Sequence, residues 1–365
     1  MRTTVGELGM DTGNVKDNGA MRICIPYGLE HRCAMCGCSC MAQLVGPLDE
    51  AELRAVEAAR EGLGASMPAG VNPIMKGVKP DGTCLHFLNF PQKRCVFLDG
   101  EHLCRIHGRY GAGQKPAACR RFPRIAIRTE NEVRVGIKPY CYATHEAGVP
   151  ARAPEDVLAR YLADEEMRAV LDELVPSASY RPSVRTGDAQ DMARADAQEA
   201  QILSWLGGDV SFAALMWGLV HGEPGGDGRL ARPFVQDVSR ALMGLAPVVD
   251  EVAAGLGNSA YAAHVHALSR ALRLGVREVG LLDGPFWAYA RYALFNAVFL
   301  RETSRFPDVS SGCLGFALGC LAACAEPEAC DEHLTTWFRV MAQTKLFESL
   351  FPSPQAFAAL MRHAG

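Results

Sequence analysis

Nine cysteines between residues 33 and 141 are the side chains whose type and spacing best suit a chemical role. Thiolates bind zinc and iron–sulfur clusters, and a tetrahedral zinc or a four-iron cluster takes about four of them. The count therefore predicts either one metal site with spare thiols or two sites that are nearly full. The predicted ligands are Cys33, Cys36, Cys38, Cys40, Cys84, Cys95, Cys104, Cys119 and Cys141.

Two other interpretations of these residues stay open. A histidine ring nitrogen could replace one thiolate. The histidines available for this are His31, His86, His102, His107 and His145. Alternatively, a free cysteine can be a small buried hydrophobe without any ligand role. That second interpretation is strongest for Cys24 and Cys38.

The charge around these cysteines also favours thiolates. Between Cys84 and Cys141 the chain has eleven Lys and Arg against four Asp and Glu, whereas the whole chain carries a net charge of −4. Cations beside a thiol favour its ionised, metal-binding form and offset the negative charge of a cluster. They could equally hold an acidic substrate or cofactor carboxylate, or form a solvated basic face. The arginines beside cysteines are Arg105, Arg120, Arg121 and Arg124.

The composition of the whole chain limits the kinds of protein that it can be. Its 365 residues suffice for two domains, and 49% hydrophobic with 21% charged residues indicates a globular protein. The negative net charge argues against nucleic acid as a partner. The first 20 residues contain no apolar run, and no stretch of 18 apolar residues occurs, so neither a secretory signal nor a membrane helix is predicted. We therefore expect a cytoplasmic protein with reduced thiols.

The cysteines are predicted to lie in a small domain of loops and short hairpins over residues 21–150, after a flexible arm at 1–20. Turn signals at 79–82, at Asp99-Gly100 and at 130–132 separate short apolar runs. The second of these turns would place Cys95 opposite Cys104 across a hairpin. Gly37 would let the backbone turn tightly between the cysteines of residues 33–40.

The first helix is predicted from a capping box. Asp49 is the expected N-cap, Glu52 the residue that completes the box, and Gly62 the expected end of the helix. A second helical segment begins at Pro154 and keeps a 3.6-residue apolar repeat to about residue 175. Residues 180–190 are the predicted linker, so residues 151–190 are assigned as helix and linker.

Residues 191–365 are predicted as an all-α domain, which makes the fold class α+β and mainly α. Cys313, Cys320 and Cys324 share one helix face, with Cys330 shortly after. Core cysteines are the favoured interpretation, and a second metal site is the alternative. An aromatic stripe at helical spacing is likewise predicted to be core; it comprises Tyr289, Tyr292, Phe295 and Phe299.

Four motifs resemble those of a known family. They are CAMCGCSC at 33–40, CVFLDGEHLCRIH at 95–107, KPAACRRFP at 115–123 and the later Cys141. Their pattern resembles the cysteine-cluster proteins described as zinc- or iron-chelating, and within them the flagellin lysine-N-methylase branch. Ser39 stands where that family usually has the first cysteine of a Cys-Cys pair, and Cys38 is an extra thiol one position earlier. Which of these positions supplies a ligand stays open.

The methylase branch resembles this chain beyond the cysteine motifs as well. Cys84 ahead of Cys95 fits that branch, and WAYARYALFNAVFLRETSRFP at 287–307 is similar to its aromatic-Asn-aromatic helix ending in Phe-Pro. The resemblance implies an iron–sulfur centre of the 4Fe-4S type. It also implies S-adenosylmethionine-dependent methylation of lysines in a protein or peptide substrate.

No motif indicates where S-adenosylmethionine would bind. The sequence contains neither a G-x-G-x-x-G turn between a strand and a helix nor a C-x-x-x-C-x-x-C triplet. No catalytic residue is predicted for the same reason. The alternative hypothesis is therefore a non-enzymatic module in which a structural zinc or iron supports the binding of a protein partner.

Overall fold

A computed structural model describes residues 21–29, 31, 36–40, 45–146, 153, 156–184, 189–225, 230, 232–257, 260–306 and 308–343. The predicted arm at 1–20 and Cys33 lie outside this part. By their internal contacts the residues form two compact units. The first unit comprises Met1–His31, Pro123–Val249 and Ala267–Gly365, and the second comprises Arg32–Phe122 and Asp250–His266. The predicted boundary at residue 150 does not coincide with this division, since residues 123–146 belong to the first unit.

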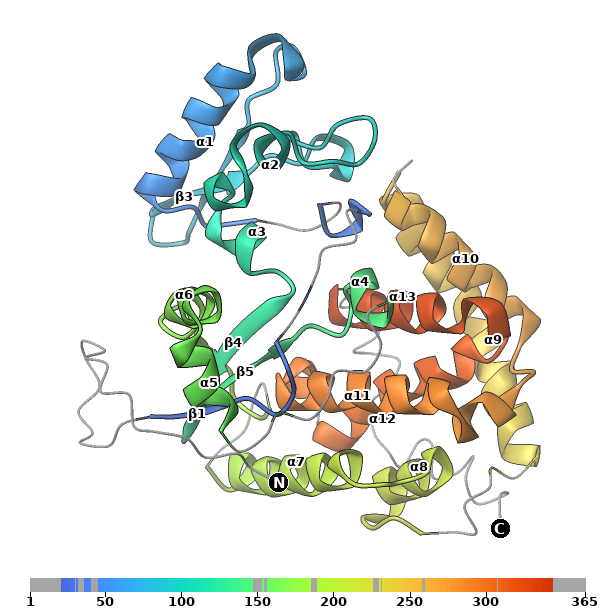
Figure 1. The fold of residues 1–365 in the computed structure, drawn as a ribbon. Helices are drawn as coiled ribbons and strands as arrows, with labels where there is room; N and C mark the ends of the chain where they lie inside the picture. Colours follow the sequence, from blue (N-terminus) through green and yellow to red (C-terminus); the bar gives the residue numbers. More distant parts are fainter. Residues whose placement is uncertain are drawn as a thin grey trace. The chain divides into compact units, whose positions relative to one another are not determined.

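The second unit begins with helix α1, Glu50–Leu63, labelled in Figure 1. The predicted capping box is confirmed, because the Asp49 side chain accepts from the amide of Glu52 and the Glu52 side chain accepts from the amide of Asp49. The predicted end at Gly62 is wrong by one residue. The helix continues to Leu63, and Gly64 caps it with a positive φ of 48°, a conformation that glycine adopts without a steric penalty.

A short antiparallel hairpin follows, and it confirms the turn signal at 79–82. Strand β2, Ile74–Val78, pairs with strand β3, Cys84–Leu88, in register from Ile74 opposite Leu88 to Val78 opposite Cys84. Two short helices come next along the chain in this unit. Helix α2 spans Arg105–Tyr110 and helix α3 spans Ala117–Arg121. Their apolar side chains pack with those of α1 in one core that includes Val56, Leu88, Phe97 and Ile106.

A four-stranded sheet in the first unit has the order β1-β5-β4-β6. Strands β4, Arg124–Arg128, and β5, Glu132–Ile137, form a hairpin, which confirms the turn signal at 130–132. Strand β1, Arg22–Cys24, runs parallel to β5, and strand β6, Ser179–Tyr180, runs parallel to β4. Residues 179–180, which were expected to be helix or linker, are thus the sheet's last strand.

Helices cover both faces of this sheet. The predicted helix from Pro154 is in fact two helices, α5 at Val157–Ala163 and α6 at Glu165–Leu174, because Asp164 interrupts the first and caps the second. Both helices pack on the strands through one apolar cluster and lie beside the hairpin in Figure 1. Strand residues next to those of this cluster form a second, smaller one, in which Cys24 and Ile127 pack with Phe299 and Leu300.

Beyond residue 189 the described chain is helical. Helix α4, Tyr142–Glu146, precedes this region. The helices are α7 at Ala189–Gly207, α8 at Phe212–His221, α9 at Arg232–Gly255, α10 at Ala260–Leu274, α11 at Pro285–Phe299, α12 at Val309–Ala323 and α13 at Cys330–Gln343. The aromatic stripe is core as predicted, with Tyr289, Tyr292 and Phe299 buried and Phe295 half-buried.

The fold class is therefore mixed α+β and mainly helical, with strands in the N-terminal part and helices after them. Within the described ranges, no helix is both long and apolar enough to cross a membrane.

Candidate metal centre

Four of the nine predicted ligands lie together in the second unit. They come from three separate segments of the chain and are Cys40, Cys95, Cys104 and Cys119. Three of them, from residue 95 onward, are half-buried against the core of this unit. Neighbouring thiols of the group act on one another's protonation, as set out below, so the four side chains share one small region.

Main-chain hydrogen bonds place Cys40 beside Cys95. Residues Cys38–Cys40 form a single 3₁₀ turn, and the carbonyl oxygen of Cys40 accepts a 2.9 Å hydrogen bond from the amide of Cys95. The amide of Val96 in turn donates to the carbonyl of Asn89, just after strand β3. Cys95 is thus held between the 3₁₀ turn and the end of the hairpin.

Cys104 reaches the same region in a way that differs from the prediction. The Asp99-Gly100 turn exists, but the bridge across it joins Leu98 to Cys104, so Cys95 is not the cross-strand partner of Cys104. The Asp99 side chain accepts hydrogen bonds from the amides of Glu101 and Leu103, which tightens the loop. Cys104 itself is the N-cap of α2.

A side chain from helix α1 positions Cys119. The Oε1 atom of Glu52 accepts a 2.7 Å hydrogen bond from the amide of Ala117, the first residue of α3. The same carboxylate completes the capping box of α1 through its other oxygen. One glutamate therefore ties the start of α1 to the short helix that carries Cys119, and the sequence motif at 115–123 is fixed to the unit's longest helix.

The environment of Cys95 and Cys119 favours the neutral form of their thiols while no cation binds them. Burial raises the pKa of the Cys95 thiol far above its usual range, and the thiols of Cys40, Cys119 and Cys104 raise it further. Burial and the Cys40 thiol raise the pKa of Cys119 to about 12, against a lowering by Lys115. A bound metal ion would reverse this, because it stabilises thiolates directly.

Three of the four predicted arginines donate hydrogen bonds to main-chain carbonyls. The guanidinium of Arg105 donates to the carbonyl of Leu98, and that of Arg120 donates to the carbonyl of Lys115. Arg124, in the first unit, donates to the carbonyl of Leu29. These three arginines therefore hold main-chain turns, and Lys115 is the cation that lowers the pKa of Cys119.

His102 lies against the turn that carries the first cysteines. Gly37 has a φ of +69°, and a Cβ atom at this position would come within 2.7 Å of the His102 Cβ. The prediction of a tight glycine turn is thus confirmed, and close approach is a second reason for it. The Nδ1 atom of His102 is buried without a hydrogen-bond partner, so this ring could supply a nitrogen ligand.

The other predicted ligands have different surroundings. Cys33 lies outside the described residues. Cys36 is half-buried, and the thiol of Cys38 is buried with its Sγ 3.7 Å from the carbonyl oxygen of Cys36. Cys84 is exposed on β3, with its Sγ 4.0 Å from Nε2 of His86. These contacts leave open which thiol of residues 33–38 is a ligand.

Cys141 belongs to the first unit, where it meets a histidine. Its Sγ is buried and lies 3.4 Å from Nε2 of His31. Burial, with a contribution from the Arg124 charge, lowers the pKa of His31 to about 4, so this ring is neutral at pH 7. His31 and Cys141 therefore form a separate pair of predicted donors. His31 lies in the loop after strand β1, and Cys141 directly precedes α4.

In the described ranges, no three His, Cys, Asp or Glu side chains are close enough together to hold one metal ion. Of the remaining predicted histidines, His107 is exposed on α2, and the side chain of His145 is outside what the structure describes. The thiols of Cys313 and Cys320 in α12, and of Cys324 at its C-cap, are fully buried, as the core interpretation predicts.

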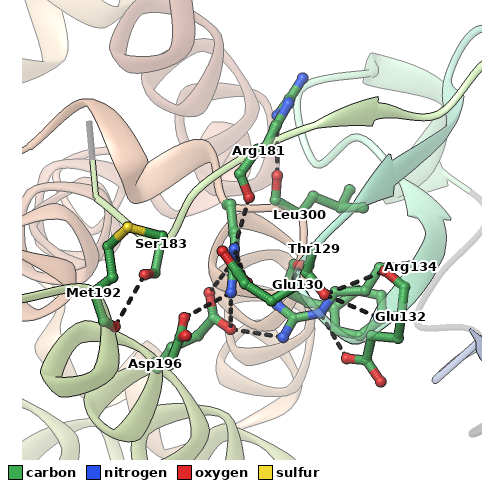
Figure 2. A network of polar contacts seen from close by, with 12 residues as sticks. Thr129, Glu130, Glu132, Arg134, Arg181, Ser183, Met192, Asp196 and Leu300 are labelled. Atoms are coloured by element: carbon green, nitrogen blue, oxygen red, sulfur yellow. Dashed lines mark hydrogen bonds and ion pairs between the residues drawn. The ribbon is translucent and has the colours of Figure 1, made fainter. Parts of the chain in front are cut away.

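A buried ion network in the first unit was not predicted from the sequence. The Arg301 guanidinium, 2% exposed, contacts Glu130, Asp196 and Glu199 at 2.8–3.0 Å, and Arg134 contacts both Glu199 and Glu132. Figure 2 shows Glu132 and Arg134 of the hairpin at the right of the network and Asp196 at its left. Its members come from distant segments, so no sequence motif contains them. The network joins the β4-β5 hairpin to α7 and to the end of α11.

Comparison with protein-family models, with characterised proteins and with solved structures finds no match to this chain. The family resemblance therefore stays a prediction from the sequence motifs.

Proposed function

We propose that this chain is a metal-binding protein whose centre is held by Cys40, Cys95, Cys104 and Cys119. The observation that carries the proposal is that Cys95, Cys104 and Cys119 pack against one small core, and that the backbone of Cys40 is hydrogen-bonded to Cys95. Four thiolates are the complete ligand set of a structural zinc or of a 4Fe-4S cluster. Metal binding would require the four side chains to turn toward one another.

The iron–sulfur form is the version that the cysteine motifs favour. The motifs resemble the flagellin lysine-N-methylase branch, so the proposed activity is S-adenosylmethionine-dependent modification of lysines in a protein or peptide. Cys33, Cys36 and Cys141 stay predicted ligands without a place in this centre. Cys84, which is exposed on the hairpin, has the weakest support as a ligand among the predicted residues.

Two measurements test this proposal. Protein purified without oxygen should contain iron and acid-labile sulfide and show the visible absorption of a cluster; a colourless protein that carries zinc without sulfide would rule the cluster out. Incubation with S-adenosylmethionine labelled in its methyl group, together with candidate proteins, should transfer label to lysine. Label that stays in the small-molecule fraction would count against the methylase activity.

A structural metal is the second candidate, and the size of the second unit favours it. Its core consists of ten buried residues, with Cys95, Cys104 and Cys119 packed against them, and small domains often need a metal to fold. Chelation separates the two candidates. Removing a structural metal should unfold residues 36–122 and abolish partner binding. Removing a catalytic centre should abolish activity while the circular dichroism signal persists.

A further inference from the structure

A groove lies beside Cys95 in the second unit. Its volume is about 410 Å³, and it opens along the loop of residues 91–105. Val71, Val96 and Leu98 supply apolar surface, and Cys95, a ligand of the proposed centre, is among the lining residues. Small-molecule sites usually measure about 300–1,000 Å³ and combine apolar walls with a few charged groups.

The charged groups in this groove have a distinctive combination. Two guanidinium groups, of Arg94 and Arg105, and one carboxylate, of Asp99, line it. The amides of Leu103 and Glu101, then the charges of Arg105 and Arg94, lower the pKa of Asp99, so its carboxylate is ionised at pH 7. A ligand that carries one carboxylate and one ammonium group matches this pattern. A simple anion would pair with the arginines but would be repelled by the Asp99 carboxylate.

Two of these charged groups, Asp99 and Arg105, are also held in place before any ligand binds. The Oδ1 atom of Asp99 accepts both amide hydrogen bonds, at 2.9 and 2.8 Å, so Oδ2 takes part in neither. The Nη1 atom of Arg105 donates a 2.6 Å hydrogen bond to the carbonyl of Leu98. Groups fixed in this way lose little conformational entropy on binding.

The backbone of the same loop is strained. In the described chain only four non-glycine residues have φ between +52° and +65°, and three of them, Gln92, Lys93 and His102, lie in this loop. Left-handed backbone at side-chain-bearing residues is unfavourable and gathers at functional sites. Strain beside the groove is consistent with a loop shaped for a ligand rather than for stability.

We infer that this groove binds the α-amino-acid end of a small molecule, with its carboxylate on Arg94 and its ammonium group on Asp99. The apolar wall then receives the rest of the molecule, and the bound ligand lies beside the proposed metal centre. The inference rests on the proposed function for its choice of ligand, S-adenosylmethionine, which carries such an amino-acid end.

Calorimetric titration of the full chain, purified without oxygen, tests this inference. The probes are S-adenosylmethionine and its decarboxylated analogue, which lacks only the carboxylate. S-adenosylmethionine should bind more tightly than the analogue by about tenfold or more, the usual effect of a charge-assisted hydrogen bond. Arg94→Gln should remove most of that difference. Asp99→Asn, which keeps the oxygen that accepts the loop amides, should weaken both ligands.

Arg54→Gln is the matched control, because Arg54 is an exposed arginine on α1 of the same unit, and it should leave both affinities unchanged. Equal affinity for the two probes, or an unchanged difference in Arg94→Gln, would overturn the inference. Iron, zinc and sulfide are measured in every sample. If metal-loaded protein binds neither probe, the groove inference is wrong and the proposed metal centre is not affected. If metal-free protein binds S-adenosylmethionine through Arg94, the groove inference holds and the proposed metal centre is wrong.

Discussion

The amide of Cys95 donates a 2.9 Å hydrogen bond to the carbonyl oxygen of Cys40, although the two residues are far apart in sequence. The bond joins two backbone groups, so it fixes the backbone positions of both cysteines without involving either side chain. The pairing also explains why the 36–40 turn and the 95–107 motif belong to one site.

Metal loading should depend on the thiols that lie together. Cys119→Ser and Cys104→Ser should each lose most of the bound metal, because a serine hydroxyl is a poor ligand for zinc or a cluster. Elemental analysis of the purified variants measures metal per chain. Cys320→Ser, in the core of α12, and Cys84→Ser, on the exposed hairpin, should retain it. Equal loss in all four variants would refute the assignment.

Acid should destabilise the first unit partly through His31. Its pKa is about 4 in the folded protein, lowered by burial and by Arg124, against 6.5 ordinarily. Between these values the unfolded chain binds a proton at His31 that the folded protein does not. The free energy of unfolding is therefore unaffected by this residue above pH 6.5 and decreases as the pH falls toward 4. Urea unfolding of His31→Gln should show a smaller loss between pH 7 and pH 5 than the unsubstituted chain. The same loss in both would exclude this histidine as a cause.

Removing Arg301 should be costly. Its guanidinium is 2% exposed and pairs with three carboxylates, of which Glu199 is 3% exposed. Arg301→Met would leave buried negative charge without its partner and should lower the free energy of unfolding by about 3–5 kcal/mol. Urea unfolding measures this. Arg54→Met is the control, because Arg54 pairs with Glu50 in the open, and it should change stability by at most about 0.5 kcal/mol. Similar values for both would refute the proposed role of burial.

Two glycines in the first unit should respond to alanine in opposite directions. A Cβ atom on Gly312 of α12 would lie 2.7 Å from the Thr303 Cβ and 3.0 Å from its backbone. Gly312→Ala should therefore destabilise the protein by about 1–3 kcal/mol through overpacking. Gly244 of α9 has nothing within 4 Å of such an atom, so Gly244→Ala should stabilise by about 0.5–1 kcal/mol. Thermal unfolding of both variants checks the sign, and destabilisation by both would contradict the contact argument.

Local signals in the sequence were reliable where the structure is local. The Asp49 capping box, the turns at 79–82 and 130–132, and the glycine turn at residue 37 depend on neighbours within a few positions. Helix ends were less predictable. Asp164 can cap a new helix or continue the old one, and the choice follows from packing against the sheet.

The sequence by itself determined that thiols gather in the first 141 residues and that helices follow, because residue type and spacing carry that information. Only the tertiary structure decided which thiols meet. Cys141 lies with His31, and Cys104 reaches its neighbours through a bridge with Leu98 rather than across from Cys95. The buried Arg301 network likewise depends on segments that fold together from far apart. Long-range contacts of this kind are set by the packing of whole elements, which no single motif specifies.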